Sequence, residues 1–198
     1  LVNNAGYGLN GAFEDLGMDE IKTQYETNVF GLIRTSQAVL PTMRRQQSGT
    51  IVNISSGAGR FGLPGASAYV STKFAVEGLS ESMSYELEPF GIKVVIVEPG
   101  VIRTNFVVDG LVVAKKSQDP HSPYSQIMQK TATGFEEMMK NASSPPDLVA
   151  KIVLNAIRDE NPSLRYLAGS DVERWLGGNK RKMADEELYK MMKQNLMM

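Results

Sequence analysis

The sequence predicts an α/β fold built on a parallel sheet. Two short runs, residues 51–54 and 92–97, are apolar and rich in β-branched side chains, as strands covered on both faces are. Two longer segments with helical periodicity, residues 19–45 and 67–90, alternate with these runs. Because parallel strands need a crossover connection, this alternation predicts right-handed βαβ units within one sheet.

The predicted helix over residues 19–45 has a broad apolar face that can cover a sheet. That face consists of Ile21, Tyr25, Val29, Leu32, Ile33 and Ala38. The predicted helix over residues 67–90 is followed by Gly91. Glycine is common just past a helix end because it adopts left-handed backbone angles without strain. We therefore expect the next strand to begin directly after Gly91.

Residues 103–143 mix Gly, Pro, Ser and Lys with apolar side chains, and we interpret this segment as a substrate-binding lid. The alternative is a mobile surface excursion with one or two short helices. A further helix is predicted next, with Ser144 as its N-cap and Pro145 at its first position. A last strand over residues 165–168 and an amphipathic surface helix over residues 185–198 complete the predicted elements.

The composition is that of a folded protein, since 42% of the 198 residues are hydrophobic. No linker divides residues 1–198, so we expect a single domain. A net charge of −1 argues against a nucleic-acid partner, and no stretch is apolar enough to span a bilayer. The lack of cysteine fits a reducing compartment, so we expect a cytoplasmic protein. The single histidine, His121, cannot form a metal site on its own, and no metal is expected.

Tyr69 and Lys73 are four residues apart on a predicted helix, so their side chains share one face. A nearby ammonium group favours the phenolate and lowers the pKa of a tyrosine by about 1–3 units, which would let Tyr69 exchange protons. The same spacing recurs at Tyr189 and Lys193, where we interpret it as part of a surface helix. Tyr69 differs because Ser56 lies upstream, just past an apolar strand, where open α/β sheets bind ligands.

Five short motifs follow one another along residues 1–104. They are Asn3-Asn4-Ala5-Gly6, Asn28-Val29-Phe30-Gly31, Ile54-Ser55-Ser56, Tyr69-Val70-Ser71-Thr72-Lys73 and Pro99-Gly100-Val101-Ile102-Arg103-Thr104. In this order and spacing they resemble the short-chain dehydrogenase/reductase family with the Tyr-x-x-x-Lys active site. The resemblance implies a Rossmann-like, doubly wound parallel sheet and a nicotinamide cofactor, either NAD or NADP.

The resemblance also implies a role for each matching residue. Tyr69 would exchange a proton with the substrate oxygen, and Ser56 would hold that oxygen. Lys73 would lower the pKa of Tyr69 and bind the nicotinamide ribose, while Asn28 would anchor a water that links Lys73 to solvent. The residues implied to bind the cofactor are Asn3, Ala5, Gly6, Tyr69, Lys73, Pro99, Gly100, Val101 and Thr104.

Measured against the family, the sequence starts at the fourth strand, with Leu1 and Val2. The expected sheet is therefore N-terminally truncated, with the first three strands absent from this chain. The glycine-rich turn that holds the dinucleotide pyrophosphate belongs to that segment, so we expect the chain as written to bind neither NAD nor NADP with ordinary affinity. Family members commonly associate through the two long helices, so we expect a homodimer or homotetramer.

The function predicted for the intact protein is hydride transfer between NAD(P)(H) and an alcohol or carbonyl substrate. The apolar, Met-rich lid favours an apolar substrate, such as a steroid-, retinoid- or lipid-like molecule. The alternative is a catalytically silent fragment that acts as a binding or scaffold protein. A relative that performs dehydration or epimerisation is a third possibility, although Ser56, Tyr69 and Lys73 together favour simple redox chemistry.

Overall fold

The computed structural model describes residues 1–107, 110–142, 144–179, 187 and 190. Its main sheet has four strands in the order β1-β3-β4-β6, all parallel. These strands are β1 (Val2–Asn3), β3 (Gly49–Ile54), β4 (Ile92–Pro99) and β6 (Arg165–Ala168). The predicted fold class is confirmed, and all three strands expected after the first helix are present.

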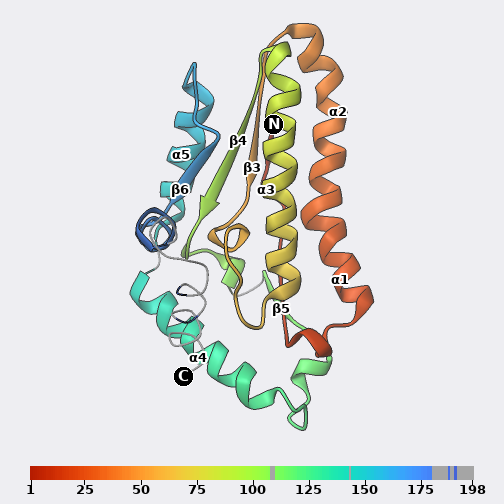
Figure 1. The fold of residues 1–198 in the computed structure, drawn as a ribbon, viewed down its shortest axis with the longest axis vertical. Helices are drawn as coiled ribbons and strands as arrows, with labels where there is room; N and C mark the ends of the chain where they lie inside the picture. The colour runs from red at the N-terminus through yellow and green to blue at the C-terminus, as the bar shows by residue number, and fades with distance from the viewer. Residues whose placement is uncertain (108–109, 143, 180–186, 188–189, 191–198) are drawn as a thin grey trace.

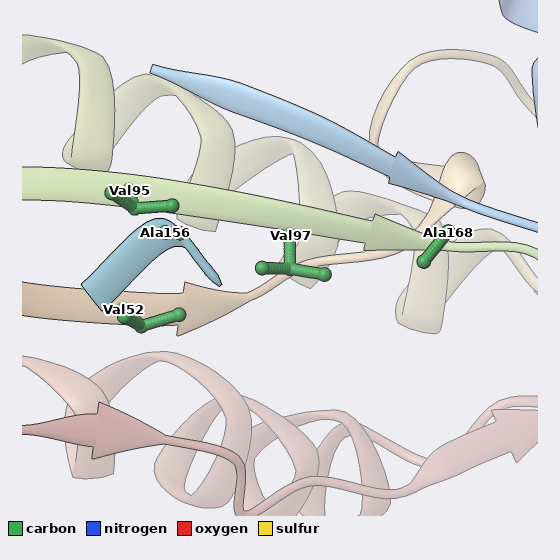
Figure 2. Close-up of a cluster of buried hydrophobic side chains, with 5 residues drawn as sticks. All are labelled: Val52, Val95, Val97, Ala156 and Ala168. Atoms are coloured by element: carbon green, nitrogen blue, oxygen red, sulfur yellow. The ribbon is translucent and has the colours of Figure 1, made fainter. Parts of the chain in front are cut away.

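The core lies on the two central strands, as their mainly apolar, β-branched sequences predict. Val52, Val95 and Val97 are fully buried on β3 and β4, together with Ala156 and Ala168 (Figure 2). Ala156 belongs to α5 (Pro146–Arg158), which covers one face of the sheet (Figure 1). β1 lies at the edge of the sheet, held to β3 by parallel pairing.

Two long helical segments lie on the other side of the sheet (Figure 1). The first combines α1 (Met18–Tyr25), a π-helical turn (Glu26–Phe30) and α2 (Gly31–Gln46), which together match the helix predicted over residues 19–45. The second is α3 (Ser67–Leu87), extended by a 3₁₀ turn to Phe90. Gly91 follows with φ 67°, so it ends the helix in the left-handed conformation as predicted.

The segment expected to be a lid has more regular structure than its sequence indicated. β5 (Leu111–Val113) pairs in parallel with β2 (Gly8–Asn10) and forms a second, two-stranded sheet. α4 (Ser125–Ala142) is an 18-residue helix beyond the carboxyl ends of the main strands (Figure 1). The alternative of a surface excursion anticipates the two short 3₁₀ turns, Asn105–Val107 and Lys116–Gln118, but not β5 or the long helix α4.

The start of α5 also differs from the prediction. Pro145, with extended backbone angles, is the N-cap, and Pro146 is the first helical residue. Ser144 instead forms an isolated bridge with Ile102, and its N–H donates to the carbonyl of Val101. This bridge holds Ser144 in extended backbone, so the helix begins later than its sequence suggests.

The helix predicted over residues 185–198 lies outside the described part of the chain, apart from residues 187 and 190. Among the described residues, no helix combines the length and the apolar character needed to cross a bilayer.

Candidate active site

The candidate catalytic residues meet where β3 ends and α3 begins. Ser56 follows β3 and is the N-cap of the short 3₁₀ turn Gly57–Gly59, where its Oγ accepts a hydrogen bond from the N–H of Ala58 at 3.1 Å. Tyr69 and Lys73 lie in the first two turns of α3. The parallel sheet therefore places Ser56 at the same end as these two side chains, as the motif order predicts.

The hydroxyl of Ser56 lies near the hydroxyl of Tyr69 and interacts with it. Burial raises the pKa of the Tyr69 hydroxyl, and the interaction with Ser56 opposes this effect without cancelling it. The Lys73 Nζ atom lies 5.7 Å from the centroid of the Tyr69 ring, so the ammonium faces the ring. The net pKa of Tyr69 is therefore raised and not lowered, because burial disfavours the phenolate, and the lowering contribution expected from Lys73 remains a prediction.

Lys73 is only 7% exposed, and its Nζ donates to the carbonyl of Ile54 at 2.9 Å. Burial lowers the pKa of Lys73 to about 8, while the carboxylate of Glu77 one helical turn further on acts in the opposite direction. Lys73 consequently remains charged at pH 7. An ammonium has three N–H donors, and the described part of the chain shows one of them donated.

Asn28 connects the segment after β1 to α3. It lies on the π-helical turn, a feature that often occurs at functional sites. Its Oδ1 accepts from the N–H of Tyr7 at 3.0 Å, and its Nδ2 donates to the carbonyl of Tyr7 and to the hydroxyl of Thr72. The side chain of Asn28 therefore ties the backbone at Tyr7 to α3, next to Lys73. The water-anchoring role remains a prediction.

Gly6 lies close to both polar groups. A Cβ at this position would be 3.2 Å from Asn28 Oδ1 and 3.9 Å from Lys73 Nζ. The glycine thus leaves space beside a buried ammonium group that has donors to spare. A buried ammonium with unused donors fits the predicted role of Lys73 in holding the hydroxyl groups of a nicotinamide ribose.

The loop after β4 is held by a residue that the sequence analysis did not identify. The N–H of Gly100 donates to the carbonyl of Ala168 at 3.0 Å, and the N–H of Val101 donates to Asp171 Oδ2 at 2.7 Å. A Cβ on Gly100 would overlap the carboxylate of Asp171. Asp171 therefore fixes the Pro-Gly loop, which the family resemblance assigns to the nicotinamide.

Three predicted cofactor residues differ in their surroundings. Ala5 and Thr104 are exposed, and the Thr104 Oγ1 accepts a hydrogen bond from the N–H of Phe106. The Asn3 side chain is bonded within the fold instead, to Thr35, Ser36 and Asn53. Asn3 thus joins β1 to β3 and α2, and the structure gives its side chain a structural role.

An apolar wall lies against Tyr69. A Cβ on Gly8 would lie 2.8 Å from a methyl group of Leu111 and 3.7 Å from the rings of both Phe106 and Tyr69. The ring centroids of Tyr69 and Phe106 are 6.1 Å apart. The predicted lid therefore brings apolar side chains next to the candidate proton donor.

A charged network lies behind Lys73. Glu77 on α3 and Glu98 on β4 are buried, and both interact with Arg165 of β6. The sequence offered a signal for Glu77, because it continues the four-residue spacing of Tyr69 and Lys73 along α3. No comparable signal pointed to Arg165 or Glu98, which come from other elements.

The family model for short-chain dehydrogenases matches residues 1–110. Oxidoreductase BOA17 of Botryotinia fuckeliana is 40% identical over 181 residues, which is 89% of this chain and 63% of the relative. The 3-ketodihydrosphingosine reductase of Bacteroides thetaiotaomicron is 37% identical over 87% of this chain and 63% of its own length. The 17-beta-hydroxysteroid dehydrogenase type 1 of Homo sapiens is 37% identical over 84% of this chain and 51% of its own length. The chain thus spans about half to two thirds of the length of these relatives.

The crystal structure of a short-chain dehydrogenase from Streptomyces avermitilis is similar over 98% of this chain and 68% of that one, with a TM-score of 0.81 and 36% identity. The predicted family is therefore confirmed by the matched residues and by the fold. The chain belongs to the short-chain dehydrogenase family.

Proposed function

We propose that the protein transfers a hydride between NAD(P)(H) and an alcohol or carbonyl substrate. The observation that carries this proposal is the placement of Ser56, Tyr69 and the buried Lys73 together at one end of the sheet, with Lys73 one helical turn from Tyr69. When bound, the nicotinamide supplies or accepts the hydride. The chain's own residues would bind the substrate oxygen and move one proton.

Tyr69 is the proton donor in carbonyl reduction. Its raised pKa keeps the hydroxyl protonated at neutral pH, as an acid catalyst requires. Ser56 would donate to the substrate oxygen beside it and stabilise the negative charge that develops there. The Lys73 ammonium would stabilise the phenolate that remains after proton transfer. We therefore expect reduction to be favoured near pH 7 and oxidation to accelerate as the pH rises.

The substrate that fits this site is an apolar ketone or alcohol. Phe106 and Leu111 form the apolar wall at Tyr69, and Met128 of α4 contacts the loop at Gly65. Methionine adapts to irregular hydrophobic ligands, which suits a large substrate. The names of two relatives, a 3-ketodihydrosphingosine reductase and a 17-beta-hydroxysteroid dehydrogenase, support the same class.

The proposal is tested with the chain extended by the family's glycine-rich N-terminal segment, which is called the full protein below. Nicotinamide absorbance is followed while it reduces two ketones, one long-chain and apolar, the other short and water-soluble. We expect the apolar ketone to give the higher kcat/KM. Tyr69→Phe should lose nearly all turnover and keep its cofactor affinity, because the hydroxyl contributes mainly to proton transfer. Tyr189→Phe, at the second Tyr-x-x-x-Lys pair, is the matched control and should be fully active.

More than a tenth of the parental kcat in Tyr69→Phe would remove Tyr69 from this role. The absence of both turnover and saturable dinucleotide binding in the full protein would instead support the scaffold alternative.

A further inference from the structure

α3 presents a third charged residue behind Tyr69 and Lys73. Glu77 lies one helical turn beyond Lys73 and is only 6% exposed. The loop that carries Ser56 rests on this turn of α3, because a Cβ on Gly59 would lie 3.0 Å from Glu77 Cγ and 3.1 Å from the Lys73 carbonyl. The side chain of Glu77 therefore packs against the loop that carries Ser56.

A guanidinium from another element fixes the Glu77 carboxylate. Arg165 on β6 donates through Nε to Glu77 Oε2 at 3.0 Å, and its other arm pairs with Glu81. The same Nε lies 3.9 Å from Glu98 Oε1, which in turn pairs with Arg60 at 2.8 Å. The ion pair with Arg165, which lies on a strand of the sheet, thus orients the Glu77 carboxylate.

Among the described residues, the carboxylates of this network outnumber its guanidinium groups. Three carboxylates, those of Glu77, Glu81 and Glu98, face the two guanidinium groups of Arg60 and Arg165. The ammonium of Lys73, one helical turn before Glu77 on α3, interacts electrostatically with the Glu77 carboxylate. Glu77 Oε1 is buried and has no hydrogen-bond partner among the described residues, so Arg165 leaves part of this carboxylate uncompensated.

We propose that Glu77 is a positioning residue for the reaction, which maintains the positive charge on the buried Lys73. The proposal rests on the proposed function, because Tyr69 makes use of that charge. The effect of Glu77 on Lys73 supports it, since this carboxylate opposes the lowering of the Lys73 pKa by burial. Glu77 itself never touches the substrate and acts only through Lys73.

The decisive variant is Glu77→Gln, which keeps the size of the side chain and removes its charge. The pKa of Lys73 is measured in the full protein, without substrate, by competitive amine labelling and mass spectrometry across a pH series. We expect this pKa to fall by about one unit relative to the parent. An unchanged Lys73 pKa in a folded Glu77→Gln protein overturns the proposal.

The pH profile of ketone reduction gives the second measurement. Removal of a carboxylate favours proton loss from the Tyr69–Lys73 pair, whichever member titrates first. The alkaline limb of the profile should therefore move to lower pH. A limb that stays at the parental pH counts against a role of Glu77 in the reaction.

Glu81→Gln is the matched control, because Glu81 pairs with the same Arg165 but is 43% exposed and one turn further from the site. It should leave the Lys73 pKa unchanged. Glu77→Asp retains the charge and should restore most of the parental pKa, which also covers the case in which Glu77→Gln fails to fold. If the Lys73 pKa falls in Glu77→Gln but the parent protein shows no turnover, the proposed function is overturned. The effect of Glu77 on the charge of Lys73 would then be supported on its own.

Discussion

The buried ammonium of Lys73 serves the proposed reaction but lowers the free energy of unfolding. Its pKa of about 8 in the folded protein lies below the ordinary value of 10.5, so the unfolded chain binds more protons between these pH values. Stability must therefore rise as the pH increases from about 8 to 10.5. At pH 7 the buried charge lowers the free energy of unfolding by about 3 kcal/mol.

Lys73→Met should consequently be inactive and yet more stable. Removing the charge recovers the cost of burial, while the carbonyl of Ile54 loses its donor at a cost of about 1 kcal/mol. We expect a net gain of about 2 kcal/mol at pH 7 in urea unfolding. The gain should shrink as the pH approaches 10. A less stable variant at pH 7 would show that the charge is not costly.

Gly100 and Asp171 should be energetically coupled. A methyl group on Gly100 would overlap the Asp171 carboxylate, so Gly100→Ala should lower the free energy of unfolding by about 1–3 kcal/mol. In an Asp171→Ala background the same substitution should cost clearly less, because the overlap is gone. A double-mutant cycle of unfolding free energies measures the difference, and strict additivity would contradict the coupling.

At the scale of elements, the central strands could be predicted because both faces are buried and the sequence is mainly apolar and β-branched. The small sheet could not, since β2 and β5 have three residues each and no alternation to detect. The start of α5 was misplaced because Ser144 is favoured at N-caps, whereas its tertiary bridge to Ile102 decides its conformation. The motifs located Ser56, Tyr69 and Lys73, but partners such as Arg165 depend on packing between distant elements.

The lid segment is fastened to the start of the chain by side-chain contacts. The buried Asp15 accepts hydrogen bonds from the hydroxyl groups of Ser122 at 2.8 Å and Ser117 at 3.4 Å. Asp15→Ala leaves both without this acceptor. We expect faster proteolytic cleavage within residues 114–125 and a higher KM for the apolar ketone. Timed digestion with peptide mapping checks this, and an unchanged cleavage rate would show that Asp15 does not hold the segment.

At the scale of the whole molecule, we propose that two copies associate through the long helices. Phe74 and Tyr85 on α3 are 46% and 67% exposed, and Phe30 on the adjoining helical run is also exposed. A second copy would remove these aromatic side chains from water. Light scattering at micromolar concentration should give at least a dimeric mass, and Phe74→Glu should reduce it. A monomeric mass for the parent would count against association.

The pairing of β2 with β5 joins residues about a hundred positions apart, and only three residues on each side make the contact. Closing so long a loop costs conformational entropy, which this short ladder offsets only weakly. The small sheet should therefore be the first part of the fold to open and the last to form. Its amide protons should exchange with deuterium sooner than those of β3 and β4. Since Leu111 of β5 and the ring of Tyr69 both lie close to Gly8 of β2, each such opening would also loosen the apolar wall beside that ring.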